Sequence, residues 1–234
     1  MAAISGQSLR FSIETLDRLS HNDPSLTSLD IRSEDGSPEA IRAIVGTLKT
    51  NSCLTWLWFH EETLDTLGVV ALSSALKQNS AIRVLFLENN HLEDDAVTSL
   101  VDALLHNACL LELLLDHNNI DAIGAIALAT ILQHNTSLSG LSLAHNHIGD
   151  DGILALSTAL QINTTLTWLS LADNDVTDEG AILLSAALSQ NVTLSSLILD
   201  SNHITNIGAT ALSTARLPSL VDLSLLENDI SYQD

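Results

Sequence analysis

Basic residues are scarce in this sequence. Lysine and arginine together number 8, against 29 aspartate and glutamate residues, and the formal net charge of the 234-residue chain is −21. Such a surface repels phosphate backbones and anionic headgroups, so we expect no nucleic-acid and no membrane partner. It attracts basic surfaces, although acidity can also serve solubility alone. The favoured partner is another protein, and a basic surface on that protein is one option.

Cysteine and long apolar runs are also scarce. No segment holds the roughly 18 consecutive apolar residues of a membrane-spanning helix. The N-terminal residues show no apolar core behind a basic start, so they predict no secretory signal. Cys53 and Cys109 lie two repeats apart in the pattern described below, too far for a disulfide, and two unpaired thiols favour a reducing compartment. The expected location is the cytoplasm, or a host cytoplasm if the chain is a bacterial effector.

Enzymatic motifs are missing as well. The sequence has no nucleophile triad, no phosphate-binding loop and no Cys-x-x-Cys pair. Its recurring glycines, such as Gly124 and Gly180, punctuate the start of successive helices and do not cluster as phosphate-binding loops do. We therefore expect a protein that is not an enzyme and that needs no cofactor.

Aromatic residues make up only 3 % of the chain, while apolar residues make up 46 %. A core of leucine, isoleucine and alanine suits many thin, equivalent layers better than one bulky centre. The sequence is indeed periodic, with the form L-x-x-L-x-L-x-x-N-x-I, seen most clearly at 138–148. The first apolar residues of the eight copies, numbered here as repeats one to eight, are Leu26, Leu54, Ile82, Leu110, Leu138, Leu166, Leu194 and Leu220.

The spacing of the copies is 28 residues six times and 26 residues once, before the last copy. Each copy predicts a short strand, and the apolar residues four apart that follow it, such as Leu128 and Leu132, predict a helix. Residues 1–25 do not match the repeat. Leu9, Phe11 and Leu16 predict a capping helix there, which covers the first layer. We therefore divide the chain into a capping helix at 1–25 and repeats at 26–234.

The last repeat is incomplete, so the chain is either a fragment or a stack whose end layer pairs with another molecule. The motif asparagines, Asn90, Asn118, Asn146, Asn174, Asn202 and Asn228, are expected to be buried and to bond backbone groups of their own and the adjacent turn.

The motif and its period resemble the leucine-rich repeat family, and within it the ribonuclease-inhibitor-like subclass. The resemblance covers residues 26 to about 230. It implies an α/β solenoid, a horseshoe of about eight repeats with a concave parallel β-sheet and convex α-helices. Proteins with repeats of this type include ribonuclease inhibitors, the sensor regions of NOD-like receptors, Ran GTPase-activating proteins and intracellular bacterial effectors.

Residues between the motif leucines alternate onto the concave face of the expected sheet. All three tryptophans fall there. Trp56, Trp58, Val84, Phe86 and Leu114 form an expected apolar patch over repeats two to four, with Glu61, Glu88, Glu112 and Asp116 beside it and Trp168 further along. Aromatic side chains ringed by charge are typical of protein-binding hot spots.

These positions predict a non-catalytic scaffold that binds a partner protein through an aromatic and acidic concave surface. One alternative is a GTPase-activating protein of the leucine-rich repeat type, for which the only concave arginine is Arg32. A host-directed bacterial effector is another. His117 and His145, flanked by Asp116 and Asp173, could hold a divalent metal such as Zn²⁺, although that rim accepts any polar residue. We assign no metal site.

Overall fold

In the computed structural model, strands and helices alternate along the chain. The structure describes residues 13–32, 38–60 and 63–231. The strands of these residues are β1 (Ser28–Ile31), β2 (Trp56–Phe59), β3 (Val84–Phe86), β4 (Glu112–Leu114), β5 (Gly140–Ser142), β6 (Trp168–Ser170), β7 (Ser196–Ile198) and β8 (Asp222–Ser224). They form one parallel sheet in sequence order, from β1 to β8.

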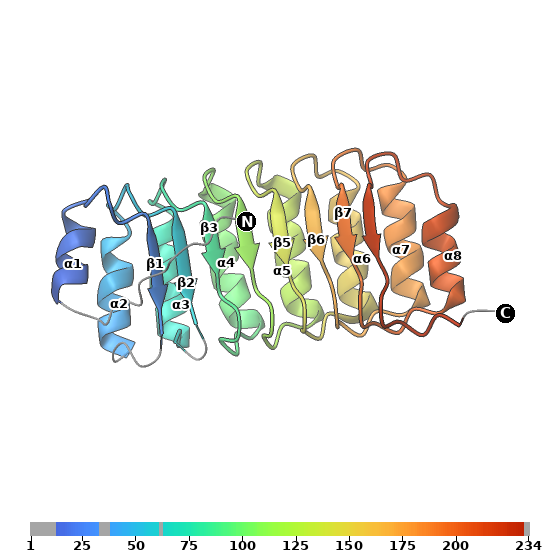
Figure 1. Cartoon of the computed structure of the whole chain (residues 1–234), viewed down its shortest axis with the longest axis horizontal. Helices are drawn as coiled ribbons and strands as arrows, with labels where there is room; N and C mark the ends of the chain where they lie inside the picture. Colours follow the sequence, from blue (N-terminus) through green and yellow to red (C-terminus); the bar gives the residue numbers. More distant parts are fainter. Residues whose placement is uncertain (1–12, 33–37, 61–62, 232–234) are drawn as a thin grey trace.

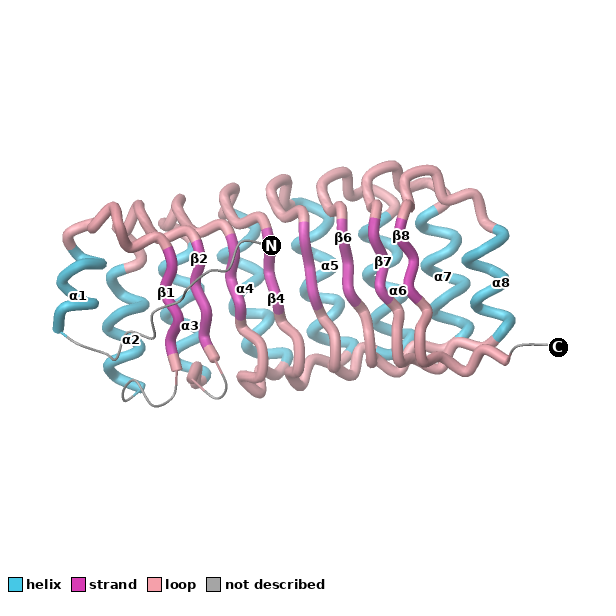
Figure 2. Tube along the Cα trace, viewed as in Figure 1, coloured by secondary structure: helices cyan, strands magenta, loops and turns pink. Residues whose placement is uncertain are grey.

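The helices all lie on one side of this sheet (Figure 1). They are α1 (Ile13–Ser20), α2 (Pro38–Thr47), α3 (Thr66–Leu76), α4 (Asp94–His106), α5 (Ala122–His134), α6 (Gly149–Leu160), α7 (Asp178–Leu188) and α8 (Asn206–Thr214). Figure 2 shows the same two layers, with loops joining them at both ends of the strands. The prediction of an α/β solenoid, with a parallel sheet as one layer and the helices as the other, is therefore confirmed.

The core lies between the two layers, and the motif leucines fill it. Strand pairing is in register from repeat to repeat, so Leu85 lies beside Leu57 and Leu113. Each of these three side chains is fully buried. The face of the sheet that points away from the helices, here called the sheet face, is left free for other contacts.

The motif asparagines form the expected ladder. Asn118 Nδ2 donates to the carbonyl oxygens of Leu87 and Leu115, both at 2.9 Å. Its Oδ1 accepts from the backbone N–H groups of Asn90 (3.2 Å) and Leu92 (2.9 Å) in the preceding repeat. The amide thus satisfies buried backbone groups of two neighbouring turns, and the prediction of a backbone-bonding ladder is confirmed.

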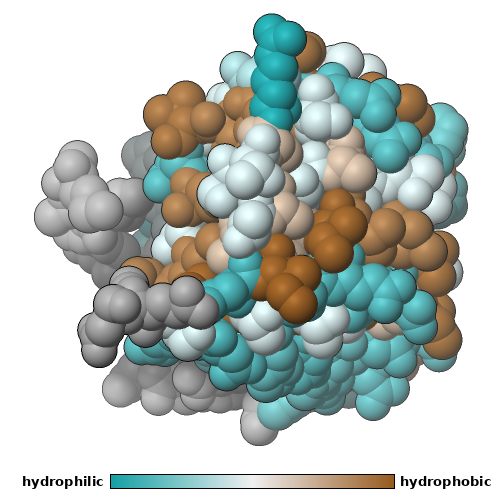
Figure 3. Space-filling view, turned by 90° about the vertical axis from the view of Figure 1, so that its right-hand side faces the viewer, coloured by the Kyte–Doolittle hydropathy of each residue, from teal (hydrophilic) through white to brown (hydrophobic). Residues whose placement is uncertain are grey.

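The two ends of the described chain differ. Leu19 of α1 is buried and Leu16 is partly buried against the first layer; the predicted cap residues Leu9 and Phe11 lie outside the described residues. At the other end, Leu223 and Leu225 are only partly buried, and Leu226 is exposed. Figure 3 looks onto this end and shows apolar side chains at its surface.

A surface hollow of about 570 Å³ opens at this end of the stack, lined by Asn206, Ala209, Thr210, Ser213, Leu225 and Ser231. No helix among the described residues is long and apolar enough to span a bilayer.

Candidate protein-binding face

Strand alternation presents the predicted residues on the sheet face. In β2 the even positions Trp56 and Trp58 are half-buried, while Leu57 and Phe59 are buried in the core. Register then places Phe86 beside Trp58, and Leu114 beside Phe86. Three adjacent strands therefore carry one continuous group of large apolar side chains, because a 28-residue period returns each position to the same place in the next strand.

Three of these side chains form an aromatic cluster, defined here as Trp56, Trp58 and Phe86. The rings of Trp58 and Phe86 stack with centroids 4.0 Å apart and planes 16° from parallel. Trp56 lies 5.7 Å from Trp58 and 6.0 Å from Phe86. Val84, predicted to belong to the same patch, is only 4 % exposed. Val84 lies beside Trp56 in the strand register and offers almost no surface of its own.

Carboxylates lie next to the aromatic cluster. Glu88 follows Phe86, and burial raises the pKa of its carboxyl above the ordinary value. The nearby charge of Asp116 raises that pKa further, while His60 opposes the shift. Asp116 is held in place by the backbone N–H of Ala144, which donates to Oδ1 at 2.8 Å. Glu61, also predicted for this acidic border, lies outside the described residues.

The sheet face beside the cluster lacks compensating cations. No outward position of strands β2 to β8, all of which are described, carries lysine or arginine. Arg32, at the end of β1, donates to Asp30 at 3.2 Å. His60 Nε2 also lies 2.8 Å from Asp30 Oδ1. Glu88, Glu112 and Asp116 therefore form a negative border on a partly desolvated apolar surface.

Trp168 is on the same face but apart from the cluster. It lies in β6, and β5 separates it from Leu114 in β4. Its indole ring covers Gly140 so closely that a Cβ atom there would clash with the ring. The sequence predicted Trp168 as a partner-binding residue, and the glycine explains its position: the ring fills the space that a side chain in β5 would occupy.

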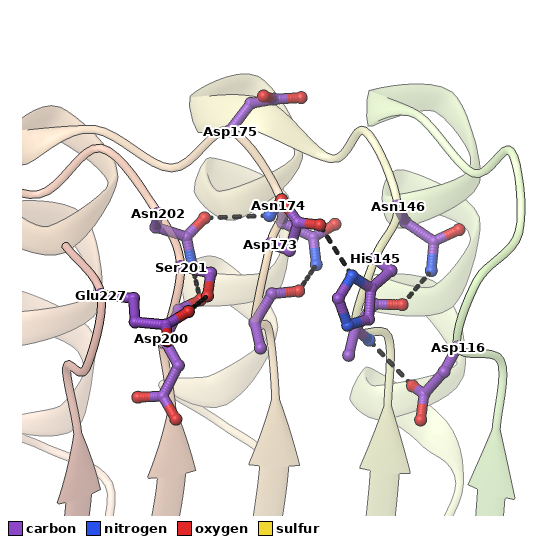
Figure 4. A network of polar contacts seen from close by, with 12 residues as sticks. Asp116, His145, Asn146, Asp173, Asn174, Asp175, Asp200, Ser201, Asn202 and Glu227 are labelled. Carbon is purple, nitrogen blue, oxygen red and sulfur yellow. Dashed lines mark hydrogen bonds and ion pairs between the residues drawn. The ribbon is translucent and has the colours of Figure 1, made fainter.

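The rim histidines are brought together, as predicted. The rings of His117 and His145 stack with centroids 3.9 Å apart, and His145 Nδ1 lies 2.7 Å from Asp173 Oδ2. Figure 4 shows the contact of His145 with Asp173 beside the asparagine ladder. Within the described residues, no group of three or more His, Cys, Asp or Glu could hold a metal ion. The zinc alternative thus gains no support there.

Backbone conformation accounts for the residue types along this rim. His117, His145 and Asp173 all have left-handed backbones, with φ of 54°, 55° and 51°. Asparagine, aspartate and histidine adopt that conformation more readily than most other residues with a side chain. The repeated turn therefore selects these residues for its own geometry, and their recurrence needs no ligand.

Comparison with known proteins agrees with this architecture. The family model described as Leucine Rich repeat matches four consecutive segments, residues 106–129, 134–157, 163–185 and 190–213. These four segments therefore carry leucine-rich repeats. These matches fall on repeats four to seven, where the motif is most regular. They do not separate subclasses of leucine-rich repeat, so the ribonuclease-inhibitor-like subclass stays a prediction.

Two solved structures are among those similar to this chain. "Leiomodin-1 Actin-Binding Site 2" has a TM-score of 0.53 and 22 % sequence identity, covering 77 % of this chain and 90 % of that one. The tropomodulin C-terminal domain of Caenorhabditis elegans has a TM-score of 0.47 and 16 % identity, covering 77 % of this chain and 93 % of that one. No curated protein sequence matches this chain.

Proposed function

We propose that this leucine-rich repeat chain is a non-catalytic scaffold that binds a partner protein through the sheet face of repeats two to four. The observation that carries the proposal is the aromatic cluster. The core of these repeats is already filled by Leu57, Leu85 and Leu113, so the fold does not require rings on the opposite side. Large stacked aromatics at a surface are the usual anchors of protein interfaces.

The border of the cluster favours a partner with lysine or arginine. Such a side chain can lay its methylene stem along Phe86 and Leu114 and bring its charge to Glu88 and Asp116. The raised pKa of Glu88 reflects a carboxylate that is desolvated and beside a like charge. A cation from the partner offsets both the desolvation of Glu88 and its repulsion by Asp116. We therefore expect the site to bind a basic ligand more tightly than a neutral one.

The similar solved structures support the general role without naming a partner. The leiomodin-1 structure is described as an actin-binding site, so a solenoid of similar fold serves there to bind a protein. At 22 % identity the likeness concerns the fold, and we do not extend actin to this chain. The alternative of a GTPase-activating protein is not favoured by the site, because Arg32 is paired with Asp30 at the end of β1. A bacterial effector would use the same binding face.

A peptide-display selection tests this proposal. The full chain is used to select from a random peptide library, and a Trp58→Ala variant serves as the counter-target. We expect enriched peptides to carry lysine or arginine next to a large apolar residue, and to bind less tightly as salt is raised. Enrichment of acidic peptides, or of peptides that bind the Trp58→Ala variant equally well, would contradict the proposal.

Replacement of Glu88 by glutamine is expected to have opposite effects on stability and on binding. Because the pKa of Glu88 is higher in the folded chain, its ionisation costs stability as the pH rises through the interval between the unfolded and folded values. Glu88→Gln should therefore raise the Tm at pH 7 by about 1–2 °C. The gain should vanish below about pH 4, where the glutamate is protonated in both states.

The same Glu88→Gln variant should bind a selected basic peptide several-fold more weakly at pH 7, since the variant has lost the negative charge that pairs with the peptide's cation. Thermal unfolding and peptide titration measure the two effects. Glu93→Gln, an exposed change at the start of α4, is the matched control and should alter neither. A fall in Tm at pH 7 for Glu88→Gln would show that its carboxylate stabilises the fold.

A further inference from the structure

The outer side of the helix layer carries an exposed apolar surface that the proposed function does not use. Ile126, Leu154 and Ile182 occupy the same repeat position on α5, α6 and α7, and they are 53 %, 50 % and 47 % exposed. Ile123, one turn before Ile126, is 64 % exposed. These residues, with the outer sides of α4 to α7, are called the helix face below.

The composition of α5 is that of a covered helix. Its sequence, AIGAIALATILQH, contains no aspartate, glutamate, lysine or arginine. Leu128 and Leu132 face the core, while Ile123 and Ile126 face outward. A helix that is apolar on all sides is normally buried on all sides. In an otherwise strongly acidic chain, this uncharged helix in the outer layer indicates a surface that is covered in use.

Charge along the helices points to what covers it. The helices of the layer run in the same direction, so their acidic first turns share one edge: Asp94 and Asp95 of α4, Asp150 and Asp151 of α6, and Asp178 and Glu179 of α7. The last turns of these helices lie at the opposite edge of the layer and hold no acidic residue. That edge carries His106 of α4 and His134 of α5. Lys77, just after α3, neutralises Asp102 on the outer side of α4.

We propose that a second copy of this chain covers the helix face, with a two-fold axis running along the row of helices. That axis turns the helices of one copy antiparallel to those of the other. The acidic edge of each copy then meets the histidine edge of its partner, and the helix dipoles oppose each other favourably. An axis parallel to the helices would instead place the two acidic edges together.

The available area fits a dimer interface. Helices α4 to α7 have 11 to 13 residues each. At ~1.5 Å per residue and about 9 Å between neighbouring axes, they cover roughly 600–700 Å². A standard interface buries about 800 Å² per partner, so the helix face provides most of that area. The net charge of −21 opposes the pairing of two chains. The uncharged centre of the helix face is what allows them to meet.

Sedimentation velocity of the full chain, under reducing conditions, tests the proposal. We expect a concentration-dependent shift from monomer to dimer with a dissociation constant in the roughly micromolar range. Association should strengthen between about 0.05 M and about 0.5 M salt, because salt screens the repulsion of the two acidic chains. A chain that stays monomeric at every concentration and salt condition would overturn the proposal.

Variants locate the interface and keep it distinct from the sheet face. Leu154→Lys and Ile126→Lys should weaken dimerisation by more than about 100-fold, because the symmetry places each lysine in the interface twice. Val192→Lys, at a more exposed apolar residue outside the helix layer, should leave the dimer intact. Trp56→Ala with Trp58→Ala should also leave it intact. A dimer that persists in Leu154→Lys, with the same unfolding curve as wild type, would overturn the assignment of the helix face.

A cysteine cross-link tests the direction of the axis. In a background with Cys53 and Cys109 replaced by serine, Leu154→Cys lies near the middle of α6, where antiparallel helices cross. It should form an intermolecular disulfide, whereas Asp151→Cys in the first turn should not. Cross-linking of Asp151→Cys in preference to Leu154→Cys would contradict the antiparallel arrangement.

Discussion

Alanine in place of Asn118 is expected to lower the free energy of unfolding by about 3–5 kcal/mol. The amide satisfies the carbonyls of Leu87 and Leu115 and the N–H groups of Asn90 and Leu92, all in buried surroundings. No water can replace it in a closely packed turn without opening the layer. The loss also weakens two adjacent repeats, since the ladder joins each turn to the next.

Urea unfolding followed by circular dichroism measures this loss. Asn119→Ala is the matched control: Asn119 is the exposed neighbour of Asn118, and its replacement should change the free energy by less than about 0.5 kcal/mol. A solenoid can unfold in more than one step, so the repeat that unfolds first should be the one that carries the substitution. Equal stability of the two variants would mean that backbone groups, and not the asparagine amide, hold the turns together.

Removal of both tryptophans of the aromatic cluster, in Trp56→Ala with Trp58→Ala, is expected to weaken binding of a selected basic peptide by about 100-fold or more. Truncation of an anchoring tryptophan commonly costs about 2–4 kcal/mol of binding free energy. The same change should cost stability only about 1–2 kcal/mol, mainly from lost ring stacking with Phe86. Binding and stability are therefore expected to separate clearly.

Isothermal titration of the double variant measures the loss of binding affinity, and thermal unfolding measures the loss of stability. Leu67→Ala, an exposed apolar truncation on α3, is the control and should affect neither. A double variant that binds as wild type does but melts far lower would assign the rings to packing, and the proposed binding face would be lost.

The repeat architecture was predictable from the sequence because one local pattern recurs with a fixed period. Each copy of the motif specifies a strand, and the constant step of 28 residues fixes the register of the next strand. The alternation of strand side chains then placed Trp56, Trp58 and Phe86 on one face correctly. The same reasoning identified the asparagine amides as backbone partners, because a buried amide in a repeated turn must bond to something.

Contacts between repeats were harder to predict, since they depend on how closely neighbouring repeats pack, which the sequence of a single repeat does not show. Acidic residues in a first turn suit the positive end of the helix dipole. Asp150 Oδ1 also accepts from the backbone N–H groups of Thr177 and Gly180, in the next repeat. A Cβ atom on Gly180 would collide with this carboxylate, so the recurring glycine serves close approach between repeats.

Two features of the sheet face do not follow from the alternation of strand side chains alone. Val84 is covered by its neighbours, although its position in the strand predicted exposure. The ring of Trp168 lies over Gly140, because β5 has no side chain there to hold it away. Both outcomes follow from the sizes of neighbouring side chains across strands, and they become visible only when the strands are placed together.

Oxidative footprinting of the full chain, with and without a selected basic peptide or the protein that contains it, tests the central claim most directly. Hydroxyl radicals modify exposed aromatic side chains, and mass spectrometry reports each one separately. We predict that bound partner slows the oxidation of Trp56, Trp58 and Phe86, while exposed residues of the helix face such as Ile126 keep their rates. Unchanged oxidation of all three rings in the saturated complex would contradict a binding site on the sheet face of repeats two to four.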